Sequence, residues 1–120
     1  LASDCNKPVI FHCVRAFPEL FALLKNFSLP WAIHGFRGKV DLLEEIWQRG
    51  GIVSFHHSIT ENLPLLKKLA APNGKIAFES DDEKELDLEK TIADTMKSSG
   101  NPDLMTLAYD TFMEFVSYGK

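Results

Sequence analysis

The sequence has no long apolar run, few cysteines and no surplus of basic charge. No hydrophobic stretch approaches the roughly 20 residues of a membrane-spanning helix, so we expect no membrane partner. Its two cysteines, Cys5 and Cys13, are too few for a disulfide framework and favour reduced thiols in a cytoplasmic protein. A formal net charge of −4 argues against a long electrostatic clamp on nucleic acid. It leaves open a pocket for a phosphodiester, because a bound dication would supply positive charge locally.

The beginning of the chain has neither an initiator methionine nor the basic and apolar regions of a signal peptide. We therefore interpret it as a processed product or a part of a longer chain. Its 120 residues, 45% of them hydrophobic, suffice for one domain with a real core. We expect a single domain over residues 1–120, because the sequence contains no linker, low-complexity tract or repeat.

Short apolar runs alternate with segments of helical periodicity along the whole chain. The runs are rich in β-branched and aromatic residues, so we predict buried strands at residues 8–13, 31–34, 52–55 and 75–79. A helical pattern follows each run, and a further helix begins near Asn101-Pro102-Asp103. This order predicts an α/β fold with a parallel sheet covered by helices. Four strands are too few to close a barrel, which leaves a small open sheet or the second half of a (β/α)8 barrel.

For two of the predicted helices the sequence also predicts the cap or the buried face. For the helix after the third strand we predict Thr60 as the N-cap and an apolar face of Leu63, Leu66 and Ala70. For the last helix, helical spacing places Phe112 on a single buried stripe.

Metal-binding residue types follow three of the predicted strands. His12 and His34 end the first and second strands, and Asp81 follows the fourth. Neighbouring parallel strands lie about 4.8 Å apart, so two imidazoles at their ends can share one ion. A lone histidine is more often held by the backbone, but packing gives no reason for histidine at two equivalent strand ends. Asp81 alone would equally suit a helix cap, and Glu79, on the same side of its strand, is either an acid behind the site or one facing the core.

Two arginines and a histidine pair extend the candidate site with less specific signals. Arg15 and Arg37 each lie three residues after a candidate ligand, where a guanidinium can bind a phosphate or a carboxylate in bidentate fashion. Ordinary surface arginines fit the pattern equally well. The pair His56-His57 is interpreted as an exposed loop rather than as further ligands.

Four segments occur in a fixed order, with the sequences FHCVRA (residues 11–16), IHGFRG (33–38), GIVSF (51–55) and FESDD (78–82). Together they resemble the TatD-type metal-dependent deoxyribonucleases, a family of amidohydrolase-like TIM barrels. The similarity extends over about residues 7–118. The resemblance implies that His12, His34 and Asp81 bind metal and that Asp81 also positions or deprotonates the attacking water. It further implies one or two divalent ions (zinc, magnesium or manganese) and DNA as the substrate. Arg15 or Arg37 would then be placed to bind the non-bridging phosphate oxygens, although the arginine of the first motif falls one position later than in the family's common pattern.

The family's remaining ligands, an Asp-x-His-x-His strand and a strand-end Glu, have no counterpart in this sequence. We therefore interpret the chain as strands five to eight and the terminal helices of the barrel, with the N-terminal half as its missing partner. Alone it is expected to be inactive or nearly so. Gly35 stands where the family commonly has Cys. Two alternatives remain: an amidohydrolase or lactonase on the same barrel, and a non-catalytic fragment that associates through its open sheet edges.

Overall fold

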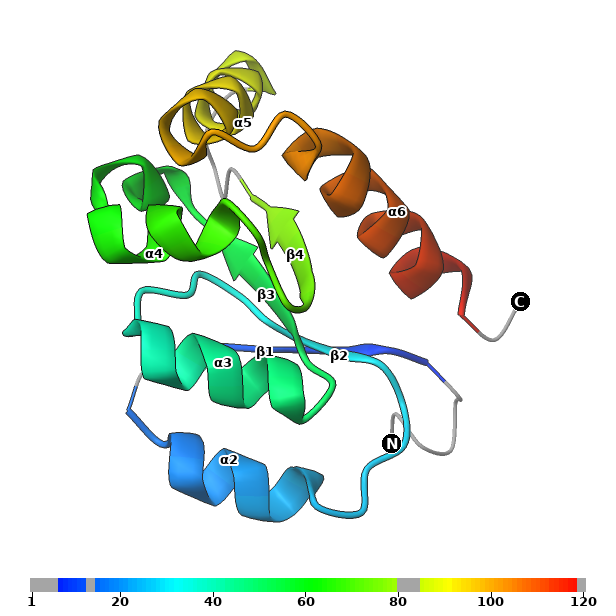
Figure 1. Ribbon diagram of the computed structural model, residues 1–120. Coiled ribbons are helices and arrows are strands. Elements are labelled where there is room, and N and C mark those ends of the chain that lie inside the picture. Colours follow the sequence, from blue (N-terminus) through cyan, green and yellow to red (C-terminus); the bar gives the residue numbers. More distant parts are fainter. Residues whose placement is uncertain (1–6, 13–14, 80–84, 119–120) are drawn as a thin grey trace.

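The structure of the chain is a computed structural model that describes residues 7–12, 15–79 and 85–118, with only the backbone of 85–87. Four parallel strands form one sheet in the order in which they occur along the chain (Figure 1). They are β1 (Val9–Phe11), β2 (Trp31–Ile33), β3 (Ile52–Phe55) and β4 (Lys75–Phe78). Each predicted strand is therefore present, and the predicted α/β class with a parallel sheet is confirmed.

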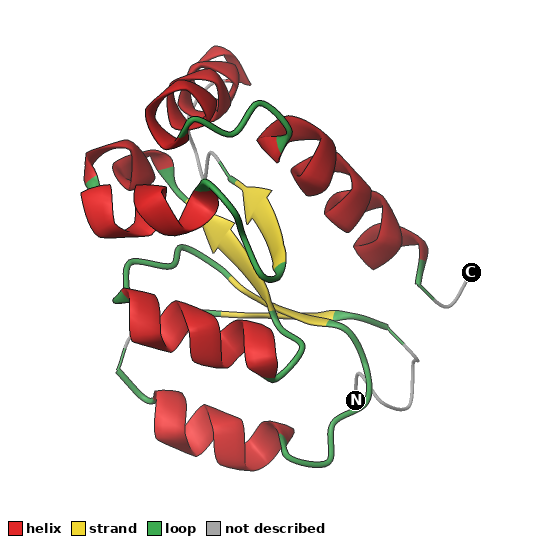
Figure 2. Cartoon of the chain, viewed as in Figure 1, coloured by secondary structure: helices red, strands yellow, loops and turns green. Residues whose placement is uncertain are grey.

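Helices connect the strands and follow the last of them, as Figure 2 shows. They are α2 (Phe17–Leu24), α3 (Val40–Gln48), the 3-10 helix η1 (His57–Glu61), α4 (Leu63–Leu69), α5 (Glu85–Ser99) and α6 (Leu104–Ser117). In Figure 1, α4 and α6 lie on opposite sides of β3 and β4, and α3 lies beside α2. None of the helices in the described part of the chain has both the length and the apolar character to cross a bilayer.

The strand register separates an apolar face of the sheet from a more polar one. Phe11, Ile33, Val53 and Ile76 stand side by side in the register, and the last three of these are fully buried in the core. One residue further along, the register aligns Ser54 with Ala77 on the opposite face, and these two side chains are only partly buried. Successive side chains of a strand point to opposite faces, so this second face is the one that carries polar groups at the strand ends.

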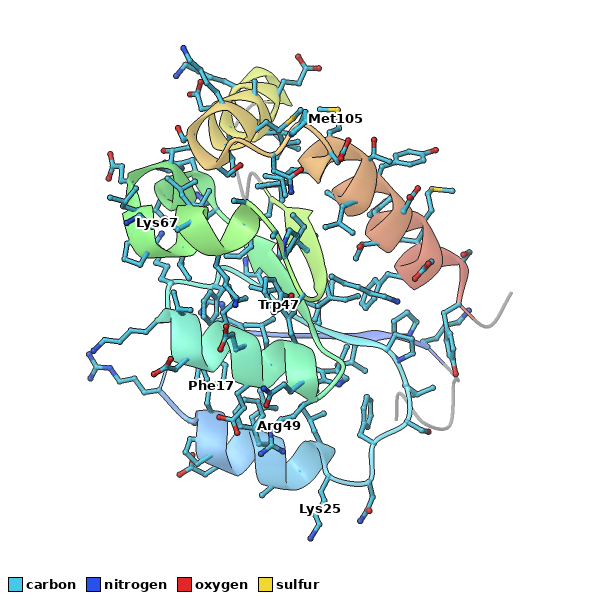
Figure 3. All side chains as sticks on the ribbon, in the orientation of Figure 1. Phe17, Lys25, Trp47, Arg49, Lys67 and Met105 are labelled. Carbon is cyan, nitrogen blue, oxygen red and sulfur yellow. The ribbon has the colours of Figure 1, made fainter. Side chains whose placement is uncertain are left out.

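Two glycines allow tryptophan rings to pack against the beginnings of β3 and β4. A Cβ atom on Gly51 would lie 2.4 Å from the ring of Trp31, and one on Gly74 would lie 2.2 Å from Trp47. The indole N–H of Trp47 donates a hydrogen bond of 3.0 Å to the carbonyl oxygen of Lys75, which fixes the orientation of the ring. Trp47 is labelled in Figure 3. Any larger residue at these glycines would displace a buried ring.

The expected start of α4 was wrong. Its N-cap is Asn62, whose side-chain oxygen accepts from the N–H of Leu65 at 3.2 Å. Thr60 instead lies in η1, where its hydroxyl donates to the carbonyl of His57. The predicted apolar face was also wrong in part: the buried residues are Leu65, Leu66 and Leu69, whereas Leu63 and Ala70 are exposed. Pro64 suits the first turn because it lacks the N–H that would be unsatisfied there.

The expectation for Phe112 was also wrong, because α6 carries apolar side chains on two faces. The inner face packs along β4 through Leu104, with Leu107 and Ala108 partly buried beside it. Phe112 is 56% exposed and belongs to a second, outer stripe with Met105, Tyr109, Met113 and Val116. Figure 3 labels Met105 at the start of this stripe. We call these five residues the outer stripe of α6.

Candidate metal centre

The structure brings His12 and His34 together at the carboxyl ends of neighbouring strands. The backbone N–H of His34 donates to the carbonyl of Phe11 at 2.8 Å, which continues the β1–β2 ladder by one step. The two imidazole centroids lie 5.8 Å apart, with the rings inclined at 47°. His12 is exposed, and the side chain of His34 is 34% exposed. Two of the three predicted ligands are therefore adjacent, side by side and accessible.

Asp81, the third predicted ligand, lies outside the described residues, as does Cys13. The described chain ends its fourth strand just before this point: the N–H of Glu79 donates to the carbonyl of Phe55 at 3.0 Å and extends the ladder one residue past β4. Among the described residues, no group of three or more histidine, cysteine, aspartate or glutamate side chains is placed to hold a metal ion. The assignment of Asp81 stays a prediction.

Glu79, which follows β4, contacts His34 across the intervening strand β3 at the same carboxyl end of the sheet. Its carboxylate oxygen Oε2 lies 3.0 Å from Nδ1 of His34 and accepts a hydrogen bond of 3.1 Å from the backbone N–H of Gly35. The hydroxyl of Ser54, on the intervening strand β3, donates to the same oxygen. The side chain of Glu79 is only 11% exposed. Of the two interpretations of Glu79 that the sequence left open, the structure supports the acid behind the candidate site.

Gly35 gives this contact its geometry. Its φ of +65° is a left-handed conformation that glycine adopts without strain, and it turns the N–H toward the carboxylate. A Cβ atom at this position would lie 3.3 Å from Oε1 of Glu79. The glycine that replaces the family's common cysteine therefore lies directly beside the buried acid.

The two candidate phosphate-binding arginines are both exposed. Arg37 borders a hollow of about 420 Å³ at the beginning of α4, together with Phe36, Asn62 and Leu65. The structure therefore places Arg37 beside an open depression, and its role toward a phosphate stays a prediction, as does that of Arg15.

The histidine pair after β3 differs from expectation in one member. His57 is exposed as predicted, but His56 is 8% exposed and lies at the N-terminal end of η1. The two imidazole centroids are 3.9 Å apart. His56 turns inward because the chain enters η1 directly after β3, rather than forming an open loop.

Comparison with known proteins identifies the family of the chain. Residues 1–91, about three quarters of the chain, match the sequence model of the family described as TatD related DNase. The chain belongs to the TatD family. TatD proteins are TIM-barrel hydrolases, and the four parallel strands with their helices are consistent with part of such a barrel. No curated protein matches the chain.

Two described side chains of this TatD protein, His12 and His34, are of a type that binds divalent cations. Imidazole nitrogen is a common ligand of zinc and other transition metals, and two imidazoles stand side by side here. Histidines that bind metals usually have their other ring nitrogen hydrogen-bonded to a carboxylate or a carbonyl, which is the relation between His34 and Glu79.

Proposed function

We propose that this chain contributes to a metal-dependent hydrolase that cleaves the phosphodiester bonds of DNA. The observation that carries the proposal is the pair of imidazoles from His12 and His34, placed 5.8 Å apart at adjacent strand ends in a member of the TatD family. Parallel (β/α) barrels assemble their active sites at this end of the strands.

His12, His34 and Asp81 are the proposed ligands. Two imidazoles suit zinc, whereas a carboxylate also suits magnesium and manganese, so we propose one or two divalent ions from this group. When bound, such an ion supplies Lewis acidity toward the phosphate and makes a water molecule more acidic. Asp81 would orient that water and accept its proton. Arg15 and Arg37, both exposed, would bind the non-bridging phosphate oxygens in bidentate fashion.

We propose further that these four strands complete their barrel with a second half. In the described sheet β1 and β4 each pair with a strand on one side only, and unpaired strand edges usually associate with other polypeptide. Ile10 on β1 is 64% exposed, and the outer stripe of α6, the helix that packs on β4, is exposed as well. Exposed large apolar side chains of this kind favour association with further polypeptide. The missing N-terminal half is the proposed occupant, and the isolated 120 residues are expected to be inactive. A cytoplasmic location stays a prediction.

The test is a nuclease assay on the protein as it is encoded, with and without added zinc, magnesium or manganese. We expect metal-stimulated DNA cleavage that His34→Ala abolishes. His57→Ala is the matched control, because His57 is an exposed histidine outside the proposed ligand set. DNA cleavage at the wild-type level in His34→Ala would refute the ligand assignment. Activity on lactones or esters without DNA cleavage would instead support the amidohydrolase or lactonase alternative.

A further inference from the structure

A buried carboxylate collects its contacts on one oxygen. Oε2 of Glu79 takes the contacts from His34, Gly35 and Ser54, which come from the end of β2 and from β3. The other oxygen, Oε1, is buried and has no hydrogen-bond partner among the described residues. Burying a carboxylate is unfavourable unless its oxygens are paired, so packing alone gives no reason for an acid here. What the carboxylate does contact is a predicted metal ligand.

We propose that Glu79 is a positioning residue that selects the tautomer and the orientation of His34. The inference rests on the proposed function, since it concerns how His34 presents a nitrogen to the ion. A neutral imidazole carries one proton, on either Nδ1 or Nε2. An ionised carboxylate can only accept, so Oε2, which accepts from the N–H of Gly35 and lies 3.0 Å from Nδ1, pairs with the tautomer that carries its proton on Nδ1. Nε2 is then the nitrogen with a lone pair for a cation.

The surrounding contacts fix the carboxylate as well as the imidazole. Ser54 holds Oε2 from the neighbouring strand, and the left-handed turn at Gly35 supplies a backbone donor directly after His34. His34 follows β2, Glu79 follows β4, and Ser54 lies in β3 between them. Because the three strands pair in one sheet, the sheet determines the separation of these groups. Such support of a metal ligand typically raises metal affinity by about 10–100-fold.

The test compares Glu79→Ala with Glu79→Gln in the protein as it is encoded, using zinc as the probe. Zinc affinity is measured by competition with a chelator, and the tautomer of His34 is read in the metal-free protein from the 15N chemical shifts of its ring. Glutamine keeps the shape and an oxygen acceptor for Nδ1, whereas alanine removes the acceptor. We expect zinc binding about 10–100-fold weaker in Glu79→Ala, with a mixture of tautomers. In Glu79→Gln we expect the Nδ1–H tautomer and an affinity within about threefold of wild type.

Three results would overturn the proposal. The first is a wild-type His34 that carries its proton on Nε2. The second is a folded Glu79→Ala variant that binds zinc as tightly as wild type, where the far-ultraviolet circular dichroism spectrum verifies folding. The third is a loss of affinity in Glu79→Gln as large as in Glu79→Ala, since this would make Glu79 a direct ligand. Failure of the proposed function is distinguishable, because a protein that binds zinc through His34 without cleaving DNA refutes only the nuclease activity.

Discussion

His34 and Glu79 connect the ends of β2 and β4 across the strand that separates them. Nδ1 of His34 lies 3.0 Å from Oε2 of Glu79, and Ser54 of β3 donates to the same oxygen from between them. Three strands of the sheet therefore meet in one small polar cluster on the face opposite Val53 and Ile76. The cluster contacts His34, whose imidazole lies beside that of His12. Substitutions in the cluster should therefore also affect the candidate metal centre.

Removal of the hydroxyl that braces Glu79 should destabilise the fold. In Ser54→Ala a buried carboxylate loses one hydrogen-bond donor, and hydrogen bonds to charged groups contribute about 1.5–3 kcal/mol. We expect the free energy of unfolding to fall by about 1.5 kcal/mol, measured by urea denaturation. Ser28→Ala, at an exposed loop position, should change it by less than about 0.5 kcal/mol. Equal effects of the two substitutions would show that the hydroxyl of Ser54 does not stabilise the carboxylate.

Gly35→Ala should weaken zinc binding in addition to its cost in stability. Gly35 and Gly50 both have positive φ, +65° and +83°, so alanine at either should cost about 1 kcal/mol in the free energy of unfolding. A new Cβ at Gly35 would lie 3.3 Å from Oε1 of Glu79. A new Cβ at Gly50 would have no atom within 4 Å. We therefore expect weaker zinc binding in Gly35→Ala alone, measured by competition with a chelator. A similar loss of affinity in Gly50→Ala would attribute the effect to general destabilisation.

Gly74→Ala should disrupt the packing of Trp47. The added Cβ would lie 2.2 Å from the indole, which must then shift and strain its hydrogen bond to the carbonyl of Lys75. Overpacking of this kind costs about 1–3 kcal/mol, and we expect a value near the upper end together with a changed tryptophan fluorescence spectrum. Gly100→Ala adds the same methyl group where nothing lies within 4 Å, so its cost should be limited to about 1 kcal/mol of backbone strain at positive φ. A smaller loss of stability in Gly74→Ala than in Gly100→Ala would contradict the packing described here.

Substitution of Asn62 tests the corrected beginning of α4. Asn62→Ala removes the side-chain oxygen that accepts from the N–H of Leu65, and loss of an N-cap costs about 1 kcal/mol. Thr60→Ala removes only an exposed hydrogen bond within η1, so it should cost less. Thermal unfolding of the two variants decides between the caps. A larger loss of stability in Thr60→Ala would restore the start expected from the sequence.

The sequence predicted those features that depend on local apolar patterns. Residues 52–55 form β3 with the predicted bounds, because a run of apolar residues between a glycine pair and polar side chains allows few other structures. The adjacency of His12 and His34 also followed from the sequence, since consecutive parallel strands place equivalent ends side by side.

The features that were not predicted from the sequence depend on competition between neighbouring residues or on the register of strands that are distant in the sequence. Thr60 and Asn62 are both good caps, and the position of Pro64 favours the later start. Phe112 follows the buried Thr111 by one residue, a rotation of about 100° that carries its ring out of the core. The contact between Glu79 and His34 joins residues 45 positions apart in the sequence and requires the register of three strands, which no local pattern specifies.

The affinity of the protein for zinc tests most directly whether the paired imidazoles form a metal centre. It should be measured in the wild type, His12→Ala, His34→Ala and the control His57→Ala. We predict that each of the first two substitutions weakens zinc binding by a factor on the order of 100 or more, and that the control binds zinc as the wild type does. Unchanged zinc affinity in both His12→Ala and His34→Ala would contradict the metal centre proposed for this sheet.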